Sequence, residues 1–296
     1  MRWVASAVAL VALTLSTPPA SAHPPSSVGG FTYPESVWWD GETGSFLVTN
    51  FGGSTPDPNG RDPDGFISRL NGEGRMVAVK WVTGLRSPKG MRRHADAVYV
   101  ADVGQLVVVD VAAAKIADTI DLDPLGAKFP NDVAVNEATG DIFVSDTLAN
   151  AIYRVPAGSR TPEIWLSSPD LEGPNGLLVD GSNLLVAAYG RDLDPATLKP
   201  KGNTGRVLTV DLASKAIAPL GGMAPVGQLD GIEKQGDSYL VTDNPGGRLL
   251  RVGPNGSVTE LNKDLKTPAD IGWRPGDGVL AVPELSVSDV KFLTIR

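Results

Sequence analysis

The sequence predicts an all-β fold, a six-bladed β-propeller, from three observations. A short motif, made of a turn and an apolar strand, recurs six times along the chain at intervals of 39 to 55 residues. Each copy is followed by further short strands rich in Val, Ile and Leu, separated by turns that contain Gly, Asp or Asn. A repeat of about 40–50 residues with several strands per copy is typical of a propeller, in which each repeat forms one blade.

The motif is clearest at residues 173–179, where a Gly-Pro-Asn-Gly turn leads into an apolar Leu-Leu-Val strand. In each copy one residue marks the start of the strand expected to lie innermost in its blade. We call these the rim residues: Glu35, Lys89, Asn131, Asn175, Asp230 and Ala269. Because innermost strands surround the central channel of a propeller, we expect the rim side chains to converge at one end of that channel.

Each copy continues with a second and a third strand, and five continue with a fourth. Second strands are expected at residues 46–50, 98–102, 142–146, 184–188, 239–243 and 279–282. Third strands are expected at 65–70, 105–110, 151–155, 206–211, 248–252 and 290–295, and fourth strands at 77–82, 116–122, 162–166, 216–220 and 258–261. The sixth copy lacks a fourth strand, so residues 31–33 near the N-terminus are expected to supply it and close the ring. Residues 23–296 therefore form one propeller domain.

Residues 1–22 are expected to be a signal peptide rather than part of the fold. Arg2 precedes an apolar run over residues 3–15, and Ala20-Ser21-Ala22 is a typical cleavage site. The run is shorter than the roughly 20 apolar residues of a membrane-spanning helix. We therefore expect a secreted or periplasmic protein that is not held by a membrane after cleavage, and we expect it to be a monomer.

The composition excludes several classes of site. A formal net charge of −8 argues against a nucleic-acid partner, since phosphates are bound by clustered Lys and Arg. The absence of cysteine excludes thiolate metal sites. With only two histidines, His23 and His94, a Ser-His-Asp relay or a histidine-rich zinc site is nearly excluded.

Four of the rim residues carry oxygen donors. Glu35 and Asp230 supply carboxylates, and Asn131 and Asn175 supply amides. Hard divalent cations prefer oxygen ligands, and Ca²⁺ takes about six to eight of them. The same residue types also favour turns because they bond to their own backbone, so each alone can be a turn residue. Their occurrence at equivalent positions of different blades favours a shared site.

Two loops expected on the same face as the rim are long. Residues 51–64 in blade 1 and residues 189–204 in blade 4 join second to third strands, and these blades face each other across a six-bladed ring. The loops are either lids that flank the channel mouth or surface decoration without a function.

The blade pattern resembles the SMP-30/gluconolactonase family, which includes regucalcin-like proteins and sugar lactonases. The resemblance covers essentially the whole mature chain and rests on a Glu before Trp-Trp-Asp (35–40), Pro-Asn-Asp (130–132), Pro-Asn-Gly (174–176) and Asp-Gly-Ile (230–232). It implies that Glu35, Asn175 and Asp230 hold one divalent metal ion at the channel mouth. Asn131 is implied as a further residue that binds substrate. Ca²⁺ is the expected metal, with Zn²⁺, Mn²⁺ and Mg²⁺ as alternatives.

The implied activity is metal-assisted hydrolysis of a small-molecule lactone or ester in the central channel, with Asp230 as the general base. Two residues depart from the family pattern. Phe129 stands where sugar lactonases often carry an Arg that binds substrate hydroxyls, so a more apolar lactone or ester is as good a candidate as a sugar lactone. The repeat also places Lys89 at the rim. There its ammonium either opposes a divalent cation beside Glu35, binds an anionic part of the substrate, or points out to solvent.

Two other functions remain open at this point. One is a non-catalytic propeller, close to NHL-type repeats, that uses its rim to bind a ligand or a protein partner. The other is a propeller that binds calcium for structural reasons only. The oxygen-donor set at the rim favours the enzyme, whereas Phe129, Lys89 and the short loops around most of the rim favour the binding protein.

Overall fold

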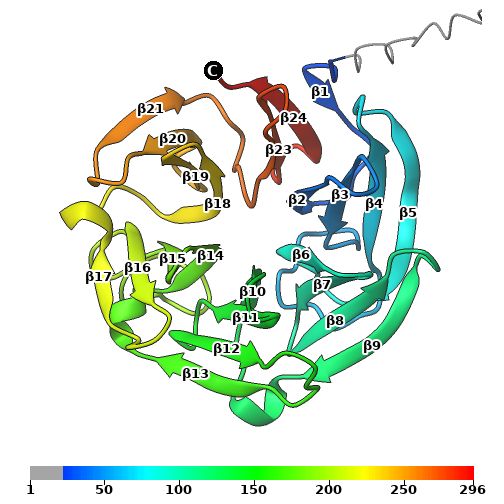
Figure 1. The fold of residues 1–296 in the computed structure, drawn as a ribbon. Coiled ribbons are helices and arrows are strands. Elements are labelled where there is room, and N and C mark those ends of the chain that lie inside the picture. Colours follow the sequence, from blue (N-terminus) through cyan, green and yellow to red (C-terminus); the bar gives the residue numbers. More distant parts are fainter. Residues whose placement is uncertain (1–22) are drawn as a thin grey trace, which may run out of the picture.

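The computed structural model describes residues 23–296, which form six four-stranded antiparallel sheets arranged as blades around a central channel (Figure 1). The prediction of a six-bladed β-propeller is confirmed. The predicted signal peptide, residues 1–22, lies outside the described residues. Within the described part of the chain, no helix has the length and the apolar character needed to cross a membrane.

The strands follow the predicted repeat closely. Blade 1 contains β2 (Pro34–Asp40), β3 (Ser45–Asn50), β4 (Gly65–Asn71) and β5 (Met76–Leu85). Blade 2 contains β6 (Met91–His94), β7 (Ala97–Asp102), β8 (Gln105–Asp110) and β9 (Lys115–Asp121). Blade 3 contains β10 (Pro130–Asn136), β11 (Asp141–Asp146), β12 (Ala151–Val155) and β13 (Glu163–Ser167). Blades 4 and 5 contain β14 (Pro174–Asp180), β15 (Asn183–Ala188), β16 (Val207–Asp211) and β17 (Ile217–Pro219); and β18 (Leu229–Gln235), β19 (Ser238–Asp243), β20 (Arg248–Val252) and β21 (Val258–Asn262). Blade 6 contains β22 (Gly272–Arg274), β23 (Val279–Glu284), β24 (Asp289–Thr294) and β1 (Ser27–Val28).

The strand that closes the ring is N-terminal, as predicted, but the residues predicted for it are wrong. Ser27 and Val28 pair with Lys291 and Val290 of β24, whereas residues 31–33 form a bend. Tyr33 has a φ of 55°, which no regular strand contains. Phe31 is buried among Phe46 and other apolar residues of blades 1 and 6. Residues 29–33 therefore lead the chain from the outer edge of blade 6 to the innermost strand of blade 1.

The hydrophobic core lies between the blades rather than at the centre of the ring. In the cluster that joins blades 3 and 4, the rings of Phe143 and Trp165 meet edge to face at 5.0 Å and pack with Leu184 and Leu208. Burying each such side chain stabilises the fold by about 1.5–3 kcal/mol. Because each cluster joins two neighbouring blades, the packing also fixes the positions of the innermost strands that surround the channel.

Most second strands end in a buried acceptor that holds the segment leading to the rim residue of the same blade. Asp146 accepts hydrogen bonds from the backbone N–H groups of Lys128 and Phe129, at 2.7 and 3.0 Å. Asp102 does the same for Arg86 and Ser87. These hydrogen bonds give the strand-ending residues a structural role. They fix the backbone just before the rim residues.

The innermost strands are irregular where the rim residues stand. The antiparallel register shifts between Pro34 and Val37 in β2, and at the equivalent places in β10, β14 and β18. Such a bulge places two residues of one strand opposite one residue of its partner, so two consecutive side chains leave the regular alternation. In these four strands the side chain that follows the rim residue can therefore also lie near the channel.

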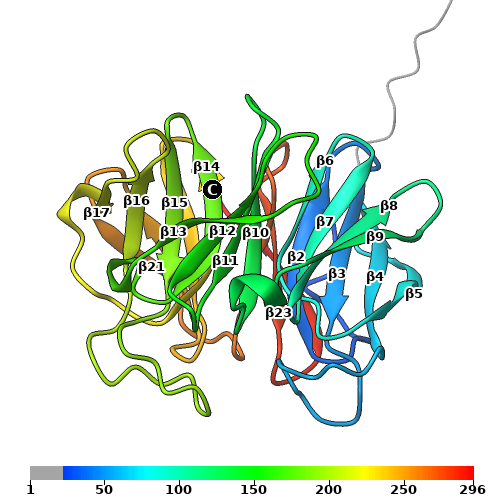
Figure 2. The same cartoon turned by 90° about the horizontal axis from the view of Figure 1, so that it is seen from below.

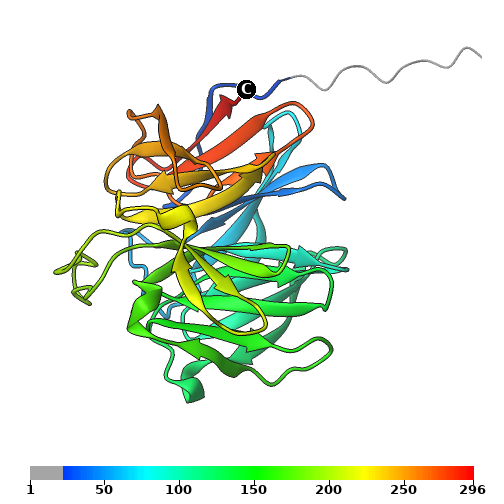
Figure 3. The same cartoon turned by 60° about the vertical axis from the view of Figure 1, so that its left-hand side comes forward.

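The two long loops project from the same face of the ring. Figure 2 shows the loop of residues 51–64 and the loop of residues 189–206 extending from the same end of the blades, on opposite sides of the molecule, and Figure 3 shows the blade-4 loop extending well beyond its strands. Both loops join a second strand to a third strand, as predicted. This face carries the rim.

Candidate functional site

A cavity of about 270 Å³ lies at this end of the channel, and all six rim residues line it. The prediction that their side chains converge is confirmed, although their chemical roles stay predictions. Both long loops also contribute to the lining, through Phe51 and Pro58 from blade 1 and Tyr189 and Leu198 from blade 4. The cavity thus combines a polar floor with walls that are largely apolar, an arrangement typical of small-molecule sites.

The predicted site residues are buried side by side at the floor. Glu35, Asn131, Asn175 and Asp230 are each 3–5% exposed. Lys89 is 1% exposed and lines the same cavity, so the alternative in which it points out to solvent is wrong. Ala269 completes the ring without a polar group.

Two carboxylate oxygens at the floor are buried and lack a hydrogen-bond partner among the described residues: Glu35 Oε2 and Asp230 Oδ1. The other oxygen of Asp230 accepts a hydrogen bond from Asn244 Nδ2 at 3.0 Å. Leaving a buried carboxylate oxygen unpaired is costly, and native structures keep few such groups. Free lone pairs on hard oxygen donors are what a divalent cation, a proton or a substrate donor takes.

Burial and mutual repulsion raise the pKa of both carboxyl groups well above their ordinary values. At Glu35 burial is the main cause, and the charge of Asp230 adds to it while Lys89 opposes it. At Asp230 burial again comes first, followed by the charges of Asp270 and Asp132. These pKa shifts mean that the floor carries more acidic groups than its basic groups compensate, which favours protons or a bound cation there.

A second ring of residues directly follows the rim residues in sequence. Asp132 accepts hydrogen bonds from the backbone N–H groups of Val133 and Leu177, at 2.7 and 2.6 Å. Asp270 accepts from the hydroxyl of Ser36 at 2.5 Å and from the backbone of Ile271 at 3.0 Å. Burial raises the pKa of both aspartates. Each one bonds to an innermost strand of the next blade, so these acids join blades.

The other three blades carry glycine at this second position: Gly90, Gly176 and Gly231. A Cβ atom on Gly90 would lie 2.0 Å from Asp132 Oδ1, and one on Gly231 would lie 2.6 Å from the backbone nitrogen of Ile271. The glycines therefore allow the next blade to approach closely. The sequence analysis missed this ring, although the restriction to Gly, Ser or Asp after every rim residue was a usable signal.

Lys89 is held in place by its neighbours. Its Nζ donates to the backbone oxygen of Ser87 at 3.1 Å and lies over the rings of Phe129 and Phe51, 4.7 and 5.7 Å from their centroids. Burial lowers the pKa of Lys89, while the charge of Glu35 acts in the opposite direction. Aromatic faces attract a buried ammonium and so stabilise its positive charge.

Below the two rings, Arg92 Nη2 lies 3.0 Å from Glu233 Oε1. Burial raises the pKa of Glu233 to about 7, although Arg92 opposes this. The pKa of Arg92 is raised, because the acidic groups Glu233, Asp132 and Asp270 together outweigh its burial. The pair adds one basic group and one more acidic group beneath the floor.

A further set of lining residues stands at equivalent positions, each one residue after the end of a second strand. Five of the six line the cavity: Phe51, Thr147, Tyr189, Asn244 and Leu285. Asn131 Nδ2 donates to Thr147 Oγ1 at 3.0 Å, and the Tyr189 hydroxyl lies 3.4 Å from Asn244 Oδ1. Apart from Phe51 and Tyr189 as ends of long loops, the sequence analysis did not identify them. Their place after the strand-ending acceptor was the signal.

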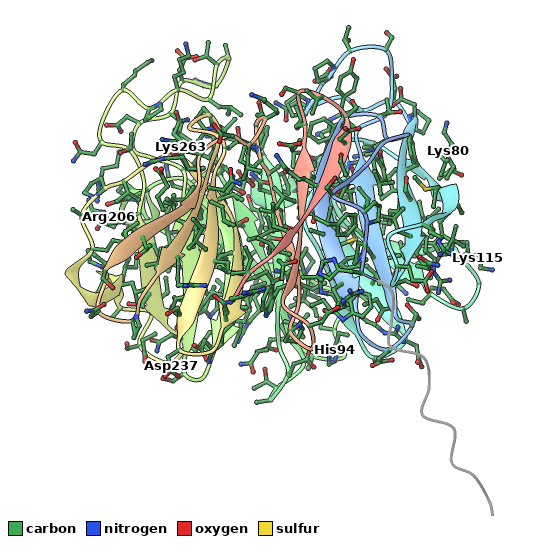
Figure 4. All side chains as sticks on the ribbon, turned by 90° about the horizontal axis from the view of Figure 1, so that it is seen from above. Lys80, His94, Lys115, Arg206, Asp237 and Lys263 are labelled. Carbon is green, nitrogen blue, oxygen red and sulfur yellow. The ribbon has the colours of Figure 1, made fainter. Side chains whose placement is uncertain are left out.

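The site offers a metal ion a limited set of donors. Within residues 23–296, no group of three or more histidine, cysteine or acidic side chains is arranged to hold a metal. Neither histidine lines the cavity: His23 contacts Thr294, and His94 lies beside Glu137 on the face opposite the long loops, as Figure 4 shows. Any metal at the floor would therefore have two carboxylates, amide oxygens and water as ligands.

Comparisons with known proteins support the fold. The sequence matches no family profile and no curated protein sequence. Among solved structures, a gluconolactonase from Xanthomonas campestris shares 15% identity over 90% of this chain and 87% of that chain, with a TM-score of 0.65. Virginiamycin B lyase from Staphylococcus aureus shares 13% identity over 91% and 98%, with a TM-score of 0.60, and a streptogramin B lyase shares 12% over 90% and 94%, with a TM-score of 0.58. These neighbours are six-bladed propeller enzymes. At such identities the likeness shows the fold alone, so the resemblance to the SMP-30/gluconolactonase family stays a prediction.

Proposed function

We propose that this propeller hydrolyses a small lactone or ester in the cavity at the channel end. The observation that carries the proposal is the pair of buried, unpartnered carboxylate oxygens, Glu35 Oε2 and Asp230 Oδ1, at the floor of a cavity of small-molecule size. The gluconolactonase among the structural neighbours is compatible with it. The non-catalytic alternative explains the cavity, but it gives no reason to keep two unpaired acidic oxygens at its floor.

The residues at the floor fit one divalent cation, because the unpartnered oxygens are hard donors. Glu35, Asn175 and Asp230 would hold it, and a donor set made of oxygen alone suits Ca²⁺ best among the expected metals. When bound, such an ion supplies positive charge that polarises a substrate carbonyl and lowers the pKa of a nearby water. It would also compensate the excess of acidic groups at the floor.

The chain's own residues would perform the following steps. The ionised carboxylate of Asp230 removes a proton from a water molecule, whose oxygen attacks the carbonyl carbon of the substrate. Expulsion of the alkoxide breaks the C–O bond, and the proton held by Asp230 passes to the alkoxide oxygen, so the products are a carboxylic acid and an alcohol. The carboxylic acid then ionises by releasing its proton to water. One oxygen of Asp230 has no hydrogen-bond partner among the described residues, so it is free to accept that proton. The Asn131 amide orients the substrate.

The lyases among the structural neighbours suggest a different reaction, but the residues that line the cavity weigh against it. A variant of virginiamycin B lyase in which one histidine is replaced by alanine is described as catalytically inactive. The cavity described above has no histidine in its lining. A carboxylate base such as Asp230 therefore suits this chain better than a histidine base, which supports the hydrolase proposal over the lyase reaction.

The test is cation binding and lactone hydrolysis by metal-stripped protein, measured by calorimetry and by acid release. We expect about one equivalent of Ca²⁺ to bind, and Asp230→Asn to lower kcat/KM by about 10²–10⁴-fold, the usual contribution of a general base. Asp237→Asn, an exposed aspartate on the opposite face, is the matched control and should change neither (Figure 4). Cation binding without turnover of any lactone or ester would favour a structural or binding propeller instead.

The predicted signal peptide leads to a second proposal, which concerns the cellular location of the protein. We infer that the reaction occurs outside the cytoplasm, in a secreted or periplasmic protein. Fractionation of cells that produce the full chain, with the mature N-terminus determined by mass spectrometry, tests this. A mature chain that starts at Met1 in the cytoplasmic fraction would contradict it.

A further inference from the structure

We propose that the part of the substrate that does not react is an apolar alkyl or aryl group, so that the substrates are hydrophobic lactones or esters rather than sugar lactones. For the reaction this inference rests on the proposed function, but for binding it rests on the cavity alone. It assigns the walls above the floor a role in specificity. Three observations support it: the residues of the walls, the use of the floor's polar groups, and the conformation of Leu198.

The walls are apolar on opposite sides of the cavity. The side chains that form them come from blades 1, 3, 4 and 6: Phe51, Pro58, Phe129, Tyr189, Leu198 and Leu285. Thr267 is a polar exception among the residues that line the cavity above the floor. Such a lining binds ligands by removing apolar surface from water and offers few partners for hydroxyl groups.

Apart from the unpartnered oxygens Glu35 Oε2 and Asp230 Oδ1, several polar groups at the floor are already engaged in hydrogen bonds. Thr147 Oγ1 accepts from Asn131 and donates to the backbone oxygen of Pro174 at 2.8 Å. Asn244 Nδ2 donates to Asp230 and to the backbone oxygen of Pro268 at 3.1 Å. Lys89 has an acceptor in Ser87 and aromatic faces over its charge. A sugar lactone would bring several hydroxyl groups to walls that cannot pair them, and unpaired polar groups reduce binding strongly.

Leu198 is placed in the lining despite an unfavourable backbone conformation. Its φ is 55°, in the left-handed region that residues other than glycine, asparagine and aspartate rarely adopt. The loop tip is held there by two hydrogen bonds, from Gln228 Nε2 to the oxygen of Leu198 at 3.3 Å and from the nitrogen of Leu198 to Asp194 at 2.8 Å. Strain of this kind clusters at ligand-binding sites. A leucine kept in this conformation supports a role in contacting the ligand.

The experiment compares kcat/KM for γ-butyrolactone, its γ-propyl and γ-hexyl derivatives, and glucono-1,5-lactone. We expect at least a tenfold rise from the unsubstituted to an alkyl-substituted lactone, since each buried methylene can give about tenfold or more, and the sugar lactone should be the poorest substrate. Leu198→Asn should remove most of that rise. Asparagine adopts the left-handed region more readily than leucine, so this variant should not lose stability.

Ala114→Asn is the matched control, because Ala114 has a φ of 51° in a turn that does not line the cavity. It should leave the whole series unchanged. Faster turnover of glucono-1,5-lactone than of the alkyl lactones would overturn the inference. An alkyl preference that survives both Leu198→Asn and Leu285→Ser would also overturn it.

Binding separates this inference from the proposed function. The γ-hexyl-substituted lactam, an analogue with an amide in place of the ester, should bind with a negative heat-capacity change in calorimetry at two temperatures. If the lactam binds but no lactone is hydrolysed, the hydrolase proposal fails and the apolar specificity stands. The opposite result is that lactones are hydrolysed while neither the alkyl-substituted lactones nor the γ-hexyl-substituted lactam bind better than γ-butyrolactone. In that case the proposed function stands and this inference fails.

Discussion

Two pairs of buried acids lie next to each other in this propeller, and they differ in one respect. Glu35 and Asp230 stand at the rim, and Asp132 and Asp270 stand in the second ring. Burial raises the pKa in all four. The second-ring acids use both carboxylate oxygens in hydrogen bonds, whereas each rim acid keeps one oxygen without a partner among the described residues. Burial and a raised pKa are therefore common to both pairs, and only unsatisfied bonding capacity marks a candidate site.

The difference between the two pairs follows from which blades their hydrogen bonds connect. Asp132 of blade 3 bonds to Leu177 of blade 4, and Asp270 of blade 6 bonds to Ser36 of blade 1. These acids hold neighbouring innermost strands together, and the pair from blade 6 to blade 1 helps to close the ring. The rim acids make no such bond between blades with their unpartnered oxygens. The comparison predicts that changes in the second ring affect stability, and that changes at the rim affect function.

The largest expected effect is at a glycine of the second ring. In Gly90→Ala the new Cβ would lie 2.0 Å from Asp132 Oδ1 and 2.7 Å from its Cα, so backbone must move. We expect a loss of about 4 kcal/mol in the free energy of unfolding, at the upper end for one substitution. Gly276→Ala, which has nothing within 4 Å of its Cβ, is the control and should change stability by less than about 0.5 kcal/mol. Urea unfolding measures both. Equal midpoints would show that the blades do not meet as closely as the second ring requires.

Much of this molecule could be predicted from the sequence because the repeat appears in two places in each blade. The rim residues mark the innermost strands, and acceptors such as Asp102, Asp146 and Asp243 mark the ends of the second strands. The closing strand could not be placed, since it is only two residues long and its position is set by pairing with β24. Two residues carry no periodic pattern, whereas residues 31–33 looked more like a strand. Of these, Phe31 is buried because it packs against apolar residues of blades 1 and 6.

The second ring and the walls were harder to predict for physical reasons. A bulge makes two consecutive side chains leave the two-residue alternation, so a strand pattern assigns Asp132 to the wrong side. Leu198 lines the cavity only because the blade-4 loop folds back onto Gln228. No local pattern contains that contact. Lys89 was placed at the rim by the repeat, but its burial depends on Phe51 and Phe129, which come from other blades.

The next effect tests the comparison between the pairs directly. Asp132→Ala leaves the buried N–H groups of Val133 and Leu177 without their acceptor, and we expect a loss of about 3 kcal/mol in the free energy of unfolding. Asp230→Asn removes a buried charge at the rim and keeps an acceptor for Asn244, so its stability should be unchanged or about 1 kcal/mol higher. Denaturant midpoints of metal-stripped protein at neutral pH measure both. A larger loss in Asp230→Asn than in Asp132→Ala would reverse the assignment of the two rings.

The smallest effect extends the comparison below the second ring, to Glu233. Its pKa is raised from the ordinary 4.5 to about 7, chiefly by burial and against the attraction of Arg92, with Asp270 adding to the rise. A raised pKa on an acid means that the folded state binds more protons than the unfolded state between these two values, so stability falls as pH rises from about 4.5 to 7 and then levels off. Glu233→Gln should reduce that slope by about 1 kcal/mol per pH unit, whereas Glu260→Gln, on an exposed strand, should leave it unchanged. Urea unfolding at pH 5, 6 and 7 measures the slope. If stability depends on pH equally in the unmodified protein, Glu233→Gln and Glu260→Gln, then Glu233 stays ionised beside Arg92. The charge of Arg92 would then compensate the acid beneath the floor, unlike the acids at the rim.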